Sequence, residues 1–220
     1  MIVIGIVGSP AGGKSTVAEQ LEAFGATWIN ADRLAREVLE RGEIQNRLLD
    51  HFGADIAGKS GQVDRAKLAA VVFGDDDSSR RALTYLEGVI HPETRRLIEL
   101  RLDEAQHSGA SKSASLAQPI VMLDVPLLFE VGWDRCCDQV WCVDADPAVR
   151  LQRAAERGWN EGELHRRESN QLKIEEKRRL SNVVIENNGT LDKLHETVTQ
   201  LWRSIESDAA ATTDDSHCQP

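Results

Sequence analysis

The sequence predicts an α/β fold in which helices cover a five-stranded parallel sheet. Short apolar runs rich in β-branched residues recur along the chain, and mainly helical patterns stand between them. A continuous apolar run without alternation is typical of a strand that is buried on both faces, as the strands of parallel sheets are. We expect strands at residues 2–7, 27–30, 120–125, 139–144 and 182–186.

The bulk properties fit a globular α/β domain with inserted subdomains. The chain has 220 residues, of which 41% are hydrophobic and 28% are charged, and its formal net charge is −10. An acidic surface repels nucleic acid, so we expect no nucleic-acid partner. No apolar stretch approaches the roughly 20 residues that span a bilayer, and the apolar N-terminus lacks the basic flank of a signal peptide. We therefore expect no membrane association and a cytoplasmic location.

The four cysteines, Cys136, Cys137, Cys142 and Cys218, show neither a CxxC pair nor zinc-ligand spacing. A strained disulfide between the adjacent Cys136 and Cys137 is an alternative, but reduced thiols are favoured.

The strongest motif lies between the first apolar run and the first helical pattern. Residues 8–15 read GSPAGGKS, which fits the phosphate-binding pattern GxxxxGK[ST]. Glycines allow backbone N–H groups to turn toward phosphate oxygens, and the following helix adds its positive end. We expect Lys14 to reach the β- and γ-phosphates, the Ser15 hydroxyl to bind Mg²⁺ and Thr16 to contact the α-phosphate. The residues assigned to the nucleoside triphosphate here are Gly8, Ala11, Gly12, Gly13, Lys14, Ser15 and Thr16.

This loop alone indicates a nucleoside triphosphate, which kinases, GTPases and ATPases all bind. The guanine-reading NKxD motif of GTPases is not matched, since the nearest text is NNGTLDK at 187–193. The strand at 120–125 ends in a single acid, Asp124, where motor and transporter ATPases usually carry two. These features favour a small-molecule kinase.

A kinase also needs a mobile cover over the phosphates, and residues 150–179 are the candidate. This segment carries nine basic residues against six glutamates in an otherwise acidic chain. The local reversal of charge indicates a lid that closes on a triphosphate. A solvated helix with Glu–Arg pairs would show the same pattern.

The remaining segments suggest how the chain is divided. Residues 33–104 are largely helical in pattern, with loops at 53–62 and 74–79, and 107–119 form a Ser-, Ala- and Gly-rich connector. The last fifteen residues contain four acids and no Lys or Arg, which predicts a disordered tail. We divide the chain into a core (1–32, 118–148 and 180–205), a helical insertion (33–117), a lid (149–179) and a tail (206–220).

Several segments taken together resemble the dephospho-CoA kinases. Besides the phosphate loop, they are INADRLAREVLERG, VDRAKLAAVVF, HPETRR, LDVPLLFEVGWDRCCDQVWCVD and RRESNQLKIEEKRRLSNVVIENNG. The resemblance covers residues 2–202 and implies a P-loop kinase fold with a nucleotide-binding core, a helical CoA-binding insertion and a lid. It also implies that ATP and Mg²⁺ phosphorylate the ribose 3′-hydroxyl of dephospho-CoA, the last step of coenzyme A synthesis.

The resemblance also implies roles for single residues. Asp32 matches the catalytic base of the family, although an N-cap of a helix at 33–39 is the alternative. The family usually reads Asp-Ala-Asp here, whereas this chain has Asn30 in the first position. Arg153 and Arg157 match the RxxxR spacing of the lid, with Gly158 where the family often has Asp.

On the acceptor side, His91 and Arg95 match a family motif, and Arg36 stands one helical turn after Asp32. A guanidinium binds oxyanions in a bidentate manner, which suits Arg95 to the pyrophosphate or the ribose. Asp124 ends a strand where a Mg²⁺ ligand is expected, and Asn187 follows the fifth strand, where the backbone can contact adenine. The assigned catalytic residues are Lys14, Asp32 and Arg153; Arg157 and Asn187 are added to the ATP site, Arg36, His91 and Arg95 bind the acceptor, and Ser15 and Asp124 bind the metal.

Two other functions remain open at this point. One is a P-loop kinase that acts on a nucleoside monophosphate or a sugar acid. The other is a non-catalytic nucleotide-sensing module that binds partners through its acidic tail. The sequence leaves the oligomeric state open.

Overall fold

The computed structural model describes residues 1–74, 76–107 and 118–214. Most of the predicted connector at 107–119 and the end of the predicted tail, residues 215–220, lie outside the described residues. The described part forms two compact units. One contains Met1–Asn30 and the chain from Leu102 onward, and the other is Ala31–Arg101.

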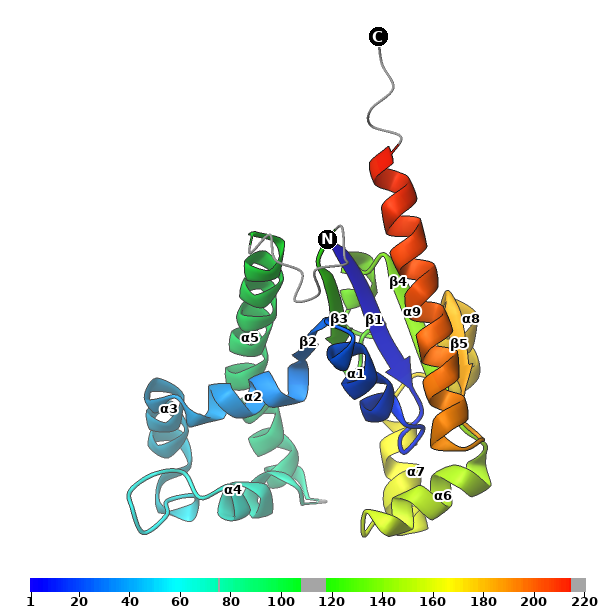
Figure 1. Ribbon diagram of the computed structural model, residues 1–220. Helices are drawn as coiled ribbons and strands as arrows, with labels where there is room; N and C mark the ends of the chain where they lie inside the picture. Colours follow the sequence, from blue (N-terminus) through cyan, green and yellow to red (C-terminus); the bar gives the residue numbers. More distant parts are fainter. Residues whose placement is uncertain (75, 108–117, 215–220) are drawn as a thin grey trace. The chain divides into compact units, whose positions relative to one another are not determined.

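The first unit contains the predicted five-stranded parallel sheet (Figure 1). Its strands are β1 (Ile2–Gly8), β2 (Thr27–Asn30), β3 (Ile120–Asp124), β4 (Gln139–Asp144) and β5 (Val183–Glu186), in the order β2-β3-β1-β4-β5. All four pairings are parallel, and the strand bounds differ from the predicted ones by no more than one residue. Because β1 lies in the centre, the loop that follows it emerges between the ends of β3 and β4.

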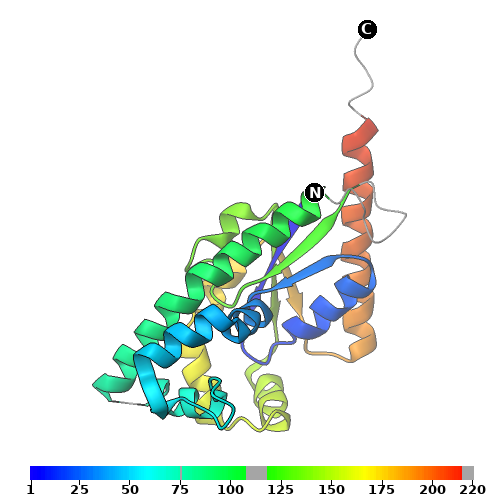
Figure 2. The same cartoon turned by 90° about the vertical axis from the view of Figure 1, so that its left-hand side faces the viewer.

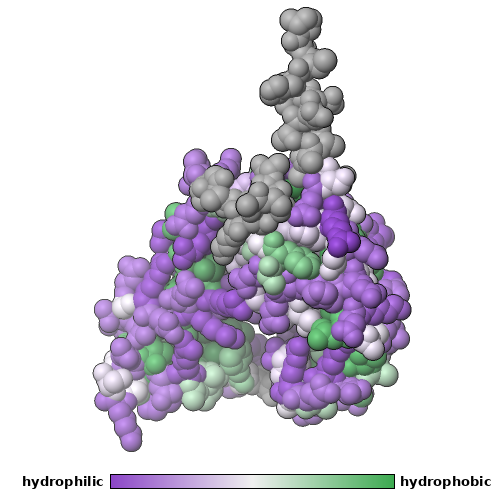
Figure 3. Space-filling model, in the orientation of Figure 1, coloured by the Kyte–Doolittle hydropathy of each residue, from purple (hydrophilic) through white to green (hydrophobic). Residues whose placement is uncertain are grey.

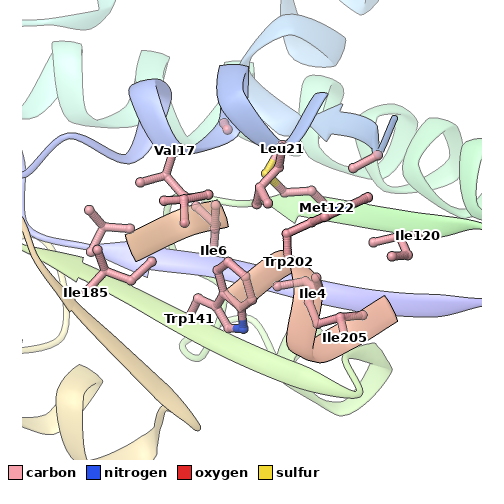
Figure 4. Packing of buried hydrophobic residues seen from close by; sticks show 14 of the residues in the cluster. Ile4, Ile6, Val17, Leu21, Ile120, Met122, Trp141, Ile185, Trp202 and Ile205 are labelled. Atoms are coloured by element: carbon pink, nitrogen blue, oxygen red, sulfur yellow. The ribbon is translucent and has the colours of Figure 1, made fainter. Parts of the chain in front are cut away.

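Two helices cover one face of this sheet and bury its main core. The helices α1 (Lys14–Ala23) and α9 (Leu191–Asp214) lie side by side against it (Figures 1 and 2). Both carry apolar residues at helical spacing, such as Val17 and Leu21 on α1, and these side chains meet β-strand residues that point to the same face. Figure 4 shows Ile4, Ile6 and Trp141 of the sheet packed against them.

The other helices of this unit gather around the phosphate loop and the opposite face. Helix α8 (Ile174–Leu180) contacts β1 and β4, and α6 (Pro147–Glu156) packs against α7 (Glu161–Ser169). All but the first two residues of α6 and the last residue of α8 lie within the segment 149–179 that the sequence assigned to the lid.

The connection between β3 and β4 differs from the expectation that a long helix separates each pair of strands. It contains a 3₁₀ helix, η2 (Trp133–Cys136), and otherwise turns. The crossing chain packs directly on β1, since a Cβ at Gly5 would lie 2.9 Å from both Leu128 Cδ1 and Cys137 Sγ. This close contact leaves no space for a helix between the connection and the strand.

The second unit is helical, as predicted, and contains α2 (Ala31–Glu40), α3 (Gly42–Phe52), η1 (Gly53–Asp55), α4 (Arg65–Val72) and most of α5 (Asp77–His107). Figure 2 shows α5 along its length. Helix α5 begins at Asp77, inside the loop predicted at 74–79. The Asp76 side chain caps the helix there, because it accepts hydrogen bonds from the backbone N–H groups of Ser78 (2.7 Å) and Ser79 (3.0 Å). The compact unit is also shorter than the predicted insertion 33–117.

Over residues 206–214 the structure differs from the predicted disordered tail. Helix α9 continues as far as Asp214. The sequence there includes three consecutive alanines, 209–211, and alanine has the highest intrinsic helix propensity. The acidic composition that suggested disorder is therefore compatible with a continuing helix.

Three of the four cysteines lie among the described residues. Cys136, Cys137 and Cys142 are free thiols, and burial raises the pKa of Cys137 to about 12 and that of Cys142 to about 11. Among the described residues, no helix combines the length and the apolar character needed to cross a membrane. The face drawn in Figure 3 is mostly hydrophilic, with smaller apolar patches.

Candidate active site

The phosphate loop turns from the end of β1 into α1, and close neighbours require its glycines. Gly8 has a φ of 152° and Gly13 a φ of 106°. A Cβ at Gly8 would overlap the Val143 carbonyl, and one at Gly13 would overlap the side-chain amide of Asn187. Ala11 also has a positive φ, 60°. Residues other than glycine rarely adopt this backbone conformation, and such residues cluster at functional sites.

Side chains from distant elements hold the backbone carbonyls of this loop. The Gly12 carbonyl accepts hydrogen bonds from Asn187 Nδ2 (2.9 Å) and Arg153 Nη1 (3.3 Å), and the Gly8 carbonyl accepts one from Lys177 Nζ (3.3 Å). Gly13 is the N-cap of α1 and makes no side-chain cap bond. The first amides of α1 therefore face no competing cap from Gly13, which suits them to a phosphate.

The side chain of Ser9 is held from the adjacent strand. Ser9 Oγ donates a hydrogen bond of 2.7 Å to Asp144 at the end of β4. Asp144 in turn pairs with Arg178 (3.2 Å), which also binds Glu186 (2.8 Å). The bonds to Glu186 and Asp144 raise the pKa of Arg178. This chain of contacts joins the loop, β4, α8 and β5.

The predicted lid residues divide into two groups. Arg153 lies at the loop, where its Nη2 also donates to the Asn187 carbonyl (3.0 Å). Arg166 and Arg167 instead pair with Glu163 on their own helix, at 2.6 and 2.9 Å. The basic segment thus contains an arginine that contacts the phosphate loop and also Glu–Arg pairs of the kind found on solvated helices.

A small apolar cluster joins the lid segment to the tip of the loop. Ala11 packs with Ala154 and Leu164, and Trp159 covers the cluster. Arg167 lies 4.1 Å and Arg157 5.7 Å from the Trp159 ring, distances at which cations are attracted to the ring face. Arg157 is exposed.

A cavity of about 540 Å³ lies beside the loop, within the first unit. Its lining includes Ser9 and Pro10 of the loop together with Arg150 and Lys177. Arg150 is itself held by the Ala145 carbonyl (2.9 Å) and by an ion pair with Glu168. Lys173 lines it as well, so the cavity has three Lys or Arg side chains on the side of the lid helices, together with Glu168 and Glu175.

The predicted metal ligands lie at the carboxyl edge of the sheet. Asp124 ends β3 next to β1, and its Oδ2 accepts a hydrogen bond of 2.9 Å from Asn30 Nδ2 on β2. Ser15 is exposed on the first turn of α1.

The described residues contain no group of three or more His, Cys, Asp or Glu side chains that could hold a metal ion. Mg²⁺ in nucleotide sites needs no such group, because one or two protein oxygens act together with the phosphates. Ser15 and Asp124 fit that pattern.

The four residues predicted for the acceptor side lie in the second unit. Asp32 is the second residue of α2, so it lies inside the helix and is not its N-cap. Arg36 follows one turn later, and both side chains are exposed. His91 and Arg95 stand one turn apart on α5, where Arg95 Nε pairs with Glu99 Oε1 at 3.1 Å. Nearby Glu93 binds Arg41 at 3.3 Å and so links α5 to the end of α2.

Comparison with known proteins identifies the family of this chain. The family model for dephospho-CoA kinase matches residues 2–193. The dephospho-CoA kinase of Rhodopirellula baltica is 41% identical over 203 residues, which cover 92% of this chain and 90% of that protein. That of Geobacter metallireducens is 39% identical over 205 residues, with coverage of 92% and 96%. The chain belongs to the dephospho-CoA kinase family.

Solved structures support the same fold. The TT1252 protein of Thermus thermophilus has a TM-score of 0.72 at 35% sequence identity. The match covers 92% of this chain and 97% of the Thermus chain. The dephospho-CoA kinase of Campylobacter jejuni has a TM-score of 0.66 at 20% identity, with coverage of 93% and 97%. The predicted P-loop kinase fold and the resemblance to this family are thus confirmed. As a kinase, the protein is a transferase that takes its phosphoryl group from ATP.

Two residues that contact the loop of this family member were not singled out from the sequence. Asp144 ends β4 just as Asp124 ends β3, and that shared position is the signal that could have found it. Lys177 was counted as one of nine basic residues in the lid segment. Its burial, with 2% of its surface exposed, depends on the packing of α8 against β1, and the sequence pattern gives no sign of it.

Proposed function

We propose that this protein transfers the γ-phosphoryl group of ATP to the ribose 3′-hydroxyl of dephospho-CoA and so completes the synthesis of coenzyme A. The observation that carries the proposal is the match of the dephospho-CoA kinase family over residues 2–193. Relatives that cover more than nine-tenths of the chain carry the same activity in their names. The intact phosphate loop and its supporting contacts are consistent with it.

On the nucleotide side, catalysis consists of positioning and charge neutralisation, because phosphoryl transfer requires little covalent chemistry from the protein. Lys14 neutralises charge that grows between the β- and γ-phosphates, and Thr16 contacts the α-phosphate. Arg153 adds its charge at the loop, where it already binds Gly12 and Asn187. The backbone around Asn187 contacts adenine, and Arg157 reaches the phosphates from the lid.

The metal ligands follow from the chemistry of their donors. Ser15 and Asp124 offer hard oxygen atoms, which Mg²⁺ prefers. The bound ion would neutralise phosphate charge and orient the transferring group. Asn30 keeps the Asp124 carboxylate in place through its 2.9 Å hydrogen bond.

On the acceptor side, Asp32 accepts the proton of the attacking 3′-hydroxyl. Arg95 binds the pyrophosphate of dephospho-CoA, and Arg36 and His91 complete the acceptor contacts. The free thiols of Cys136, Cys137 and Cys142 are typical of a reducing compartment, which supports a cytoplasmic enzyme. We infer no nucleic-acid or membrane partner.

The proposal is tested by ADP release in a coupled assay with a panel of acceptors. Dephospho-CoA should support turnover far better than AMP or a sugar acid, and NMR of the product should place the new phosphate on the ribose 3′-oxygen. Preference for AMP or a sugar acid would identify a different small-molecule kinase. Nucleotide binding without acceptor-dependent ADP release would indicate a sensing module instead.

A further inference from the structure

Lys177 on α8 is a buried lysine whose two partners are neutral. Only 2% of its surface is exposed. Within the described part of the chain, its Nζ donates hydrogen bonds to Gln171 Oε1 (2.6 Å) and the Gly8 carbonyl (3.3 Å). A buried ammonium without a paired carboxylate is costly, and a methionine of similar size would fill the space without that cost. The cost of burying this ammonium indicates that the lysine has a functional role.

The two hydrogen-bond partners of Lys177 belong to different segments, the phosphate loop and the turn before α8. Gly8 is the last residue of β1 and the first of the phosphate loop. Gln171 lies in the turn between α7 and α8, and the next residue, Leu172, donates its N–H to Glu130 Oε1 at 2.6 Å. The turn is thus bonded both to the connection after β3 and, through Lys177, to the loop.

We propose that Lys177 is a positioning residue that fixes the first carbonyl of the phosphate loop and ties it to the turn at residues 170–173 of the lid segment. The far end of the loop is held in the same way, since Asn187 and Arg153 bind the Gly12 carbonyl. With both ends held, the loop amides keep the arrangement that a polyphosphate requires. The inference rests on nucleotide binding by the proposed function, and not on the identity of the acceptor.

The charge of Lys177 adds a second consequence. Burial, followed by the nearby charge of Lys14, lowers its pKa to about 8, while Glu130 and Cys142 oppose the shift. A triphosphate bound to the loop brings negative charge, which favours the protonated form. Nucleotide binding near pH 8 should therefore take up protons at Lys177.

The test uses two variants of the full-length protein and a non-hydrolysable ATP analogue with Mg²⁺, without acceptor. Lys177→Met removes both the donor and the charge, whereas Lys177→Gln keeps an N–H donor without the charge. Calorimetry should show that the Met variant binds the analogue about tenfold more weakly or worse, and that the Gln variant lies between it and the wild type. Lys193→Met, which removes an exposed lysine of α9, is the matched control and should bind like the wild type.

Proton uptake gives a readout that a purely structural role would not change. Measured at pH 8 in buffers of different ionisation enthalpy, uptake should be present in the wild type and in Lys193→Met and be reduced in Lys177→Gln. Wild-type affinity in a folded Lys177→Met protein would overturn the proposal. If the Met variant does not fold, wild-type affinity together with unchanged proton uptake in Lys177→Gln would overturn it. Failure of the acceptor assignment would leave these binding results unaffected, because no acceptor is present.

Discussion

The nucleotide side and the acceptor side of this protein are constructed in different ways. Around the phosphate loop, Gly8, Ser9 and Gly12 are each bonded to side chains that stand more than a hundred residues away in sequence. On α2 and α5, the proposed acceptor residues are exposed, and Arg95 pairs with Glu99 on its own helix. The loop is therefore fixed by long-range contacts, whereas the acceptor residues take their places from the helix backbone.

Substitutions on the two sides should therefore have different effects. Substitutions among the acceptor residues should change kinetics and leave stability nearly unchanged, because exposed side chains contribute little to the core. Changes around the loop should alter nucleotide binding first and acceptor binding little. The following predictions test this division, from the largest expected effect to the smallest.

Asp32→Asn should lower kcat by roughly 10²–10⁴-fold, because an amide keeps the shape of the side chain but accepts no proton at neutral pH. The melting temperature and the affinity for ATP should change little, since the side chain is exposed on α2. Steady-state kinetics with Asp50→Asn, an exposed acid of α3, provide the control. Normal turnover of the Asp32 variant would remove the general base from the mechanism.

Lys14→Ala should lower kcat/KM for ATP by roughly 10²–10³-fold, the usual effect of removing one group that stabilises transition-state charge. The KM for dephospho-CoA should stay near the wild-type value, and circular dichroism should show a folded protein. Lys193→Ala removes an exposed lysine outside the loop and should be active. If the KM for dephospho-CoA rose as much as the KM for ATP, the separation of the two sides would fail.

Arg95→Ala should raise the KM for dephospho-CoA at least about tenfold and leave the KM for ATP nearly unchanged, since it removes a charge-assisted contact to an anion. The existing pair with Glu99 is exposed and contributes little, so exchanging it for a pyrophosphate is not costly. The neighbouring Arg96, which pairs with Glu93 at 3.2 Å, gives the control variant Arg96→Ala. Equal changes in both KM values would place Arg95 in a structural role.

Asp76→Ala should reduce stability slightly, and only at pH values where the carboxyl is ionised. The N–H of Ser79 is the largest of the hydrogen-bond donors that lower the Asp76 pKa from its ordinary 3.8. A lowered folded-state pKa stabilises the protein above the ordinary value, and this contribution is lost as the pH falls through the folded value. Thermal melts should therefore show a difference from the wild type at pH 7 that disappears in acid. Asp76→Asn keeps a capping side chain without the charge and should lose this pH dependence; an unchanged difference in acid would rule out titration of Asp76.

Much of this architecture could be predicted from the sequence because it depends on local patterns. Apolar runs located all five strands, and the spacing of Gly8, Gly13 and Lys14 located the phosphate loop. Two of the features that were missed depend on tertiary contacts. The short crossing from β3 to β4 follows from contact with Gly5, and the burial of Lys177 follows from the packing of α8 on the sheet. The helix beyond residue 205 was missed for another reason, since acidic composition was given more weight than three alanines.

Hydrogen–deuterium exchange on the wild-type protein, with each ligand added separately, tests the division most directly. A non-hydrolysable ATP analogue should slow exchange in Gly8–Thr16 and around Asn187. Dephospho-CoA should slow it in the first turns of α2 and around residues 91–95 of α5. If dephospho-CoA instead protected the phosphate loop and left α2 and α5 unchanged, the acceptor residues proposed here would be wrong and the two sides would not be separate.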